Sequence, residues 1–245
     1  MWSLALANRL VGNPEGAAAL ETSGLVAFDL AAPAMVAVVG AMVDVVVDDG
    51  PPMGWGMPTS LPAGAVVRLG AVRDGLRSYI AVRGGLRRVA HTADVTCTGP
   101  SRSSRGDVEV LDLGPDPGTS AASEAAAPQP PASVLHVWPG PRLDWLESDA
   151  WQVLTTREWV VQPDSNRIGA RLAGPALARK RAGELPSEGL VEGAVQVPPD
   201  GQPIVMLADH PTTGGYPVIA VVDPAHVRHV AQSAPGTTVR FRPAR

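Results

Sequence analysis

The density of turn-forming residues constrains the fold of this chain more than any other feature of its sequence. The 245 residues include 26 glycines and 25 prolines. Proline fixes φ and lacks a backbone N–H, whereas glycine readily takes positive φ, so this density interrupts long helices and favours turns between short strands. Valine-rich stretches between the turns, such as 25–47 and 218–222, are typical strands. We therefore expect a mainly β protein with few short helices.

Composition also excludes several classes of function. The net charge of −4 and the aromatic content of 4% argue against nucleic-acid binding. Cys97 is the only cysteine, which excludes an internal disulfide or a cluster of thiolate ligands. His226 and His229 are three residues apart, but the sequence shows no third ligand, so we expect no metal site. No apolar run resembles a membrane span or a signal peptide, so we expect a cytoplasmic protein without a membrane partner.

One segment divides the chain into two parts. Residues 115–133 contain no aromatic and no branched aliphatic side chain, so they cannot bury enough apolar surface to order themselves. We interpret them as a linker between a first β lobe, 1–114, and a second β lobe, 134–245. Helical patterns are confined to 2–10 and 144–154.

Two arginines in the second lobe form the first candidate site. Arg167 and Arg171 lie four residues apart in the sequence Asp-Ser-Asn-Arg-Ile-Gly-Ala-Arg-Leu, residues 164–172. On an extended strand both guanidinium groups would share one face and could bind a carboxylate or phosphate. The alternative is a pair of surface arginines beside a glycine turn.

The second candidate is a glycine-containing loop between two valine-rich strands. Thr212, Thr213, Gly214 and Gly215 could present backbone N–H groups as a nest that binds an oxyanion, and Asp209 could orient a water, a hydroxyl or an arginine. The alternative is a tight turn that uses glycine for its conformational freedom. Gln196 is the polar exception in an apolar strand that leads to a turn at 198–201.

Several signatures of nucleotide and cofactor chemistry are missing from the sequence. We find no phosphate loop, no Rossmann glycine fingerprint, no nucleophile elbow and no Met-Lys-Met biotinylation site. A nucleotide or biotin must therefore be handled by another mode or by another chain.

Three segments of the second lobe, taken in their order along the chain, resemble segments of the KipA family. The resemblance rests on Ser-Asn-Arg-Ile-Gly-Ala-Arg-Leu at 165–172, Gln-Val-Pro-x-Asp-Gly-x-Pro at 196–203 and Asp-x-x-Thr-Thr-Gly-Gly-Tyr-Pro at 209–217. In the first lobe, 7–13 and 76–85 are also similar to family segments. The family comprises the C subunit of prokaryotic 5-oxoprolinase, also described as a biotin-dependent carboxyltransferase or allophanate hydrolase subunit 2.

The resemblance implies two cyclophilin-like β-barrel lobes and a site completed by a KipI-like B subunit, with the A subunit also needed for full activity. The implied reaction is ATP-dependent hydrolysis of 5-oxo-L-proline, a lactam, to L-glutamate, with ATP bound by the complex or by this chain. The implied catalytic residues are Asp209, Thr212, Thr213, Gly214 and Gly215. The implied substrate-binding residues are Arg167, Arg171, Gln196 and Tyr216.

Two alternatives remain open within this resemblance. One is transfer of a carboxyl group from carboxybiotin to urea, and biotin enters only there. The other is a regulatory protein that binds a KipI-like inhibitor without catalysis.

The chain departs from the family pattern in two places. The first lobe is N-terminally truncated relative to the family, which implies an exposed sheet edge and poor solubility. Residues 87–105 also lack the Gly-Ser-Arg-Ser pattern that the family usually has after the paired glycines.

Overall fold

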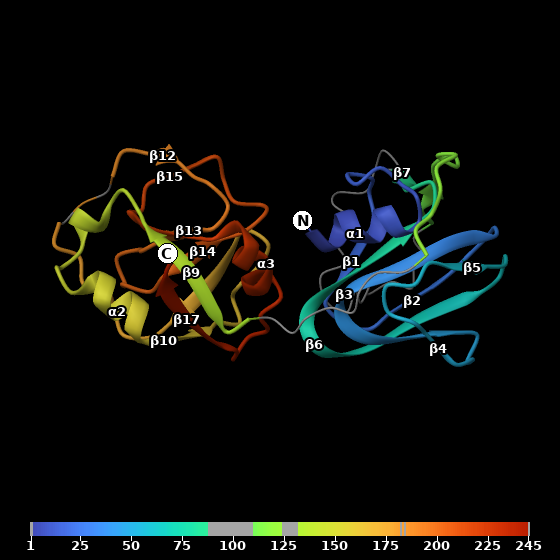
Figure 1. Ribbon diagram of the computed structural model, residues 1–245, viewed down its shortest axis with the longest axis horizontal. Coiled ribbons are helices and arrows are strands. Elements are labelled where there is room, and N and C mark those ends of the chain that lie inside the picture. Colours follow the sequence, from blue (N-terminus) through green and yellow to red (C-terminus); the bar gives the residue numbers. More distant parts are fainter. Residues whose placement is uncertain (1, 88–109, 124–131, 182, 184, 245) are drawn as a thin grey trace. The chain divides into compact units, whose positions relative to one another are not determined.

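The computed structural model describes residues 2–87, 110–123, 132–181, 183 and 185–244 (Figure 1). The chain divides into two compact units, Met1–Gln129 and Pro130–Arg245. In the described ranges, strands make up most of the regular structure and the α-helices number three. The expected mainly β fold is confirmed. No helix in these ranges is long and apolar enough to cross a membrane.

The first unit is built on a six-stranded antiparallel sheet. Its two long strands pair with each other over most of their length and carry the shorter strands at their edges. A separate two-stranded sheet pairs the segment just before the undescribed residues 88–109 with the segment just after them. The strands are β1 (Leu20–Thr22), β2 (Val26–Asp29), β3 (Ala34–Val47), β4 (Pro52–Met53), β5 (Thr59–Leu61), β6 (Val66–Val82), β7 (Leu86–Arg87) and β8 (Asp112–Leu113).

The long strands differ from the short segments that the glycines predict. Gly40 adopts φ +101° inside β3, and the register with β6 shifts between Gly40 and Met42. A Cβ at Gly40 would lie 2.3 Å from the Arg77 carbonyl oxygen. The glycine therefore bends the strand at a bulge without ending it, because only glycine fits this φ and this close approach.

Helix α1 (Trp2–Leu10), which the sequence predicts at the same residues, packs on one face of this sheet. Its Ala7 and Leu10 are buried against Val39 and Ala81. The opposite face of the sheet forms a second core that includes Ile80. Strand β3 and the last residues of β6, 79–82, thus bury side chains on both faces, which explains why β3 is a nearly continuous apolar run.

Two buried asparagines fix the end of α1 to the end of β6. The Asn13 side-chain amide donates to the Val82 carbonyl at 2.9 Å and to Asn8 Oδ1 at 3.1 Å, and Asn13 Oδ1 accepts from the Gly84 N–H at 2.8 Å. Asn8 donates in turn to the Ala17 carbonyl at 2.8 Å. The family-like segments at 7–13 and 76–85 therefore form one interlocked polar network.

Replacing Asn13 by alanine should destabilise the first unit by about 2 kcal/mol. The substitution leaves a buried carbonyl and a partly buried N–H without their partner, which costs about 1–3 kcal/mol. Glu15→Ala is the matched control, because the Glu15 side chain is 61% exposed and its ion pair with Arg9 spans 3.5 Å. Urea unfolding followed by circular dichroism measures both. Equal small effects would show that the network does not stabilise the unit.

The first part of the predicted linker belongs to the first unit, which corrects the boundary at 115. Arg83 donates to Asp116 Oδ1 at 3.0 Å, to the Thr119 carbonyl at 2.7 Å and to the Val11 carbonyl at 2.9 Å. The pKa of Asp116 is lowered by its hydrogen bond from Arg83 and then by that from the Gly118 N–H. The polar backbone and one carboxylate order this segment, and composition alone does not reveal such contacts.

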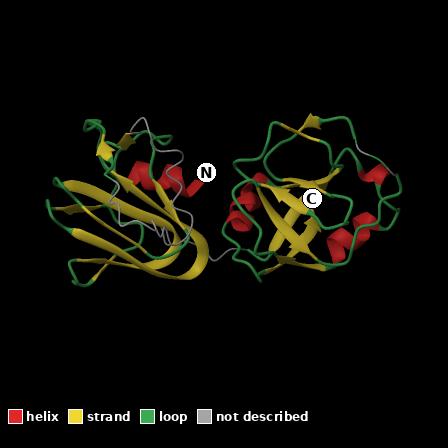
Figure 2. Ribbon diagram, turned by 180° about the vertical axis from the view of Figure 1, so that it is seen from behind, coloured by secondary structure: helices red, strands yellow, loops and turns green. Residues whose placement is uncertain are grey.

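The second unit is a closed barrel with strand order β10-β11-β14-β13-β16-β9-β17, in which β17 pairs with β10 (Figure 2). Trp159, Phe241 and Leu135 are fully buried at its centre. A short two-stranded ribbon lies outside the barrel sheet. The strands are β9 (Val134–Pro139), β10 (Glu158–Val161), β11 (Gly169–Ala173), β12 (Glu188–Gly189), β13 (Ala194–Gln196), β14 (Ile204–Met206), β15 (Thr213–Gly214), β16 (Val218–Val222) and β17 (Thr238–Pro243).

The helices of the second unit depart from the sequence prediction. The predicted helix at 144–154 is split into a 3₁₀ turn (Leu143–Trp145) and α2 (Ala150–Thr156). Buried Leu146 lies between them in an extended conformation and bridges to Arg179, so tertiary pairing overrides the helical pattern. Helix α3 (Pro224–Ala231) was not predicted, although Asp223 caps it by accepting from the Ala225 N–H.

Candidate functional site

Arg167 and Asp209 form the ion pair that connects the two candidate motifs of the second unit. Arg167 Nε lies 2.8 Å from Asp209 Oδ2, and Nη2 lies 3.3 Å from Oδ1. The pairing of β11 with β14 brings the two loops together, and the Asp209 N–H also donates to the Arg167 carbonyl at 3.1 Å. The side chains are 35% and 44% exposed, so solvent reaches this pair. Asp209 therefore holds Arg167 in a fixed orientation at the surface.

The loop that carries Arg167 is fixed by its own side chains. Asn166 Oδ1 accepts from the Ile168 N–H at 2.8 Å and from the Gly169 N–H at 3.2 Å, and Ser165 Oγ accepts from the Arg171 N–H at 3.0 Å. Such side-chain acceptors satisfy the turn and keep its backbone rigid. The Ser-Asn-Arg-Ile-Gly sequence is thus a turn that ends where β11 begins.

The structure corrects the expected placement of the two arginines on one strand face. Arg171 lies on β11, whereas Arg167 precedes the strand. Arg171 Nε is 3.1 Å from Asp164 Oδ2, so the two guanidinium groups pair with different carboxylates. The spacing of four residues does not place them together, because the Asn166 turn intervenes.

The structure also corrects the expected nest of N–H groups at 212–215. Gly214 and Gly215 do not have positive φ, which a nest of alternating handedness requires. Instead β15 pairs with β12, with Gly214 opposite Glu188 and Thr213 opposite Gly189 (Figure 1). Thr212, Thr213 and Tyr216 are exposed along this segment. We call β12, β15 and residues 212–216 the ribbon.

Gln196 lies beneath the ribbon and explains the need for glycine there. Its side chain is 3% exposed, and its amide nitrogen donates to the Tyr216 carbonyl at 3.0 Å. A Cβ at Gly214 would lie 2.8 Å from Gln196 Nε2 and 2.8 Å from Leu190 Cδ1. A side chain at 214 would displace Leu190 or Gln196, and Gln196 acts as a support for the ribbon.

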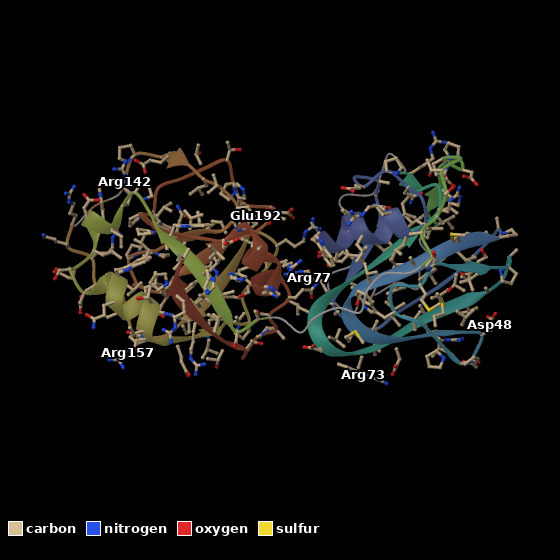
Figure 3. All side chains as sticks on the ribbon, in the orientation of Figure 1. Asp48, Arg73, Arg77, Arg142, Arg157 and Glu192 are labelled. Carbon is tan, nitrogen blue, oxygen red and sulfur yellow. The ribbon has the colours of Figure 1, made fainter. Side chains whose placement is uncertain are left out.

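An ion pair that the sequence did not indicate ties the ribbon to the barrel. Arg142 Nε donates to Glu188 Oε2 at 2.9 Å, and Arg142 Nη2 pairs with Glu188 Oε1 (Figure 3 labels Arg142). The hydrogen bond from Arg142 holds the pKa of Glu188 below its ordinary value. The two residues are 46 positions apart, and no motif includes either of them, so only the fold reveals the pair.

Other candidate sites carry less chemistry. His226 and His229 lie on α3, and the His136 N–H donates to His226 Nδ1 at 2.9 Å. The described ranges contain no group of three or more His, Cys, Asp or Glu side chains that could hold a metal. Cys97 and most of the divergent stretch 87–105 lie outside the described residues.

Two pockets, of about 400 and 380 Å³, lie in the first unit beside the Arg83 contacts. The charged groups that line the first of them, Arg83 and Asp116, already pair with each other. We therefore place the candidate site on the second unit.

Comparison with known proteins shows close similarity along nearly the whole chain. A family model described as the carboxyltransferase domain, subdomain A and B, matches residues 1–243. The C subunit of 5-oxoprolinase from Escherichia coli (strain K12) is 33% identical over 249 residues, which cover 98% of this chain and 80% of that protein. The urea amidolyase of Lachancea kluyveri is 28% identical over 274 residues, which cover 99% of this chain and 15% of that protein.

A crystal structure of the protein TTHA0988 has the same fold. It superposes with a TM-score of 0.78 at 31% sequence identity and covers 98% of this chain. The match covers 48% of the TTHA0988 chain, so this chain spans about half the length of that solved relative.

Proposed function

This chain belongs to the carboxyltransferase domain family, subdomain A and B, and from that premise we propose that it is the C subunit of an ATP-dependent 5-oxoprolinase. The observation that carries the proposal is the similarity to the E. coli protein over 98% of this chain. The proposed reaction opens the lactam of 5-oxo-L-proline to give L-glutamate. The proposed complex contains a KipI-like B subunit together with an A subunit, and it works in the cytoplasm.

The site on the second unit supports this chemistry in two ways. Opening a lactam develops negative charge on its carbonyl oxygen, and backbone N–H groups of the ribbon, with the Thr212 and Thr213 hydroxyls, are suitable donors to it. The substrate also carries a carboxylate, which suits the oriented guanidinium of Arg167. Asp209 and Gln196 hold these groups in place. Arg171 on β11, which pairs with Asp164, is proposed as a further substrate-binding residue, and Tyr216 offers an exposed aromatic side chain.

ATP enters the proposal as a second substrate of the complex. The sequence has no phosphate loop, and Lys180 is its only lysine. We therefore assign the nucleotide to the assembled complex and give this chain the role of contributing half of the lactam site.

Reconstitution tests the proposed function. The chain is co-expressed with the proposed A and B subunits from the same organism, and the purified complex is assayed for glutamate release. We expect release that requires both ATP and 5-oxoproline and that is lost when this chain is omitted. A stable complex without glutamate release would contradict the proposal and favour a regulatory antagonist of a KipI-like protein.

Urea carboxylation is a second candidate, favoured by the similarity to urea amidolyase of L. kluyveri. In that reaction this chain would bind urea as it takes the carboxyl group from carboxybiotin, which regenerates biotin, and the biotin would be carried on another protein because this chain has no Met-Lys-Met site. Urea-dependent ATP hydrolysis in the presence of a biotin carboxylase and its carrier, without activity on 5-oxoproline, would identify this function.

A further inference from the structure

The ribbon is a marginal structure that needs support from outside itself. Each of its strands is two residues long, and β12 and β15 pair with each other without joining the barrel sheet. Additional main-chain bonds run from the Leu190 N–H to the Thr212 carbonyl at 2.9 Å and from the Leu185 N–H to the Gly215 carbonyl at 3.3 Å. A two-stranded unit of this length is barely stable in water.

The backbone around Arg142 is fixed to the strand that follows the ribbon. The Gly140 N–H donates to the Ile219 carbonyl at 2.8 Å, and the Arg142 N–H donates to the Val218 carbonyl at 3.0 Å. A Cβ at Gly140 would lie 2.5 Å from the Val218 carbonyl oxygen, so the two backbones are in close contact. Strand β16 begins two residues after Tyr216, and Arg142 is therefore anchored next to the C-terminal end of the ribbon.

The side chain of Arg142 reaches the other strand of the ribbon. Its guanidinium contacts both oxygens of Glu188, and Glu188 pairs with Gly214 in the β12–β15 register. The two side chains are 37% and 31% exposed, so the pair is partly shielded from solvent. A two-point contact between a guanidinium and a carboxylate also fixes the orientation of the two side chains relative to each other, whereas a single exposed contact does not.

We propose that Arg142 is a positioning residue of the site, which holds the ribbon in register over the barrel through Glu188. The proposal rests on the proposed function, in which ribbon N–H groups bind the developing oxyanion. Donors contribute to catalysis only when they are aimed before the charge develops, so a loosened ribbon lowers turnover even when the substrate still binds.

Hydrogen exchange on the isolated full-length chain tests the positioning without reference to any activity. Arg142→Ala should raise exchange of the Leu190 and Leu185 amides, which donate to the Thr212 and Gly215 carbonyls of the ribbon, about 10-fold, with little change in the barrel strands. Arg240→Ala is the matched control, because Arg240 also pairs with a carboxylate across two strands, Glu158 on β10, and is 44% exposed. The double variant R142E/E188R restores the pair in reverse and should recover most of the protection. Unchanged exchange in Arg142→Ala would overturn the proposal.

Kinetics of the reconstituted complex separate this proposal from the proposed function. Arg142→Ala should lower kcat about 10-fold and leave KM within about 2-fold, since Arg142 contacts no substrate in this assignment. If the wild-type complex lacks 5-oxoprolinase activity, the proposed function fails while the exchange result still decides the positioning. A rise in KM alone would assign Arg142 to substrate binding and overturn the positioning role.

The ion pair should also make the ribbon sensitive to acid. Arg142 lowers the pKa of Glu188, and Asp144 adds a further carboxylate facing Arg142. Because the pKa of Glu188 is lowered in the folded state, the ion pair stabilises the ribbon above the ordinary glutamate pKa of 4.5. This stabilisation is lost as the pH falls through the lowered pKa. Protection of the Leu185 and Leu190 amides, corrected for intrinsic exchange, should be constant from about pH 7 down to the ordinary glutamate value of 4.5 and fall at lower pH. Arg142→Ala should show no such fall, and an identical fall in both proteins would contradict the assignment to Glu188.

Discussion

Replacing Gly214 by valine should lower kcat of the reconstituted complex about 100-fold while the barrel stays folded. The new side chain would begin 2.8 Å from both Gln196 Nε2 and Leu190 Cδ1. Gln196 is buried and donates to the Tyr216 carbonyl, so it cannot move away without giving up that bond. The ribbon would have to lift, and its N–H groups would lose their aim at the lactam oxygen.

The control for this prediction lies on the neighbouring strand. Gly189 pairs with Thr213, and a Cβ there would meet nothing within 4 Å. Neither Gly189 nor Gly214 has positive φ, so valine causes no backbone strain at either position. Gly189→Val should therefore keep turnover within about 2-fold of wild type. Steady-state assays measure kcat for both variants. An equal loss of kcat in both would rule out the contact with Gln196 as the cause of the loss in Gly214→Val.

The sequence predicted the overall β character and the first helix, because these depend on local patterns. Turn residues and apolar runs report on backbone freedom and burial, and α1 matches its predicted range. The sequence did not predict that β3 continues through Gly40, since a glycine bulge and a strand end look alike. It also did not predict that Asp116 and Thr119 bind Arg83, because those contacts span more than 30 residues.

Prediction of the site was limited by the same distinction between local and distant information. The motifs at 165–172 and 209–217 pointed to Arg167 and Asp209, which the structure places in one ion pair. The expected N–H donors at 212–215 lie on a paired strand and not in a nest of alternating handedness, because Gly-Gly suits both positive φ and close packing, and only the structure shows the second. Arg142 and Glu188 could not be found, because a salt bridge across 46 residues leaves no local pattern.

Replacing Arg167 by alanine should lower kcat/KM for 5-oxoproline about 100-fold, mainly through KM. This chain offers the oriented guanidinium as the partner of the substrate carboxylate, and loss of a hydrogen bond to a charged group costs about 1.5–3 kcal/mol. The matched control is Arg68→Ala, because Arg68 also pairs with an aspartate at 3.1 Å and is 48% exposed, but lies in the first unit. Its loss should leave kcat/KM unchanged within about 2-fold.

The role of Asp209 follows from a double-mutant cycle with Arg167. If Asp209 acts by orienting Arg167, Asp209→Asn alone should lower kcat/KM about 10-fold. In the Arg167→Ala background the same change should then add almost nothing, because no guanidinium remains to be oriented. Independent losses that multiply would instead show that Asp209 contacts the reacting groups itself, as a base or as a ligand of the attacking water. Asp209, in the loop after β14, would then be a catalytic carboxylate whose orientation is set by its ion pair with Arg167.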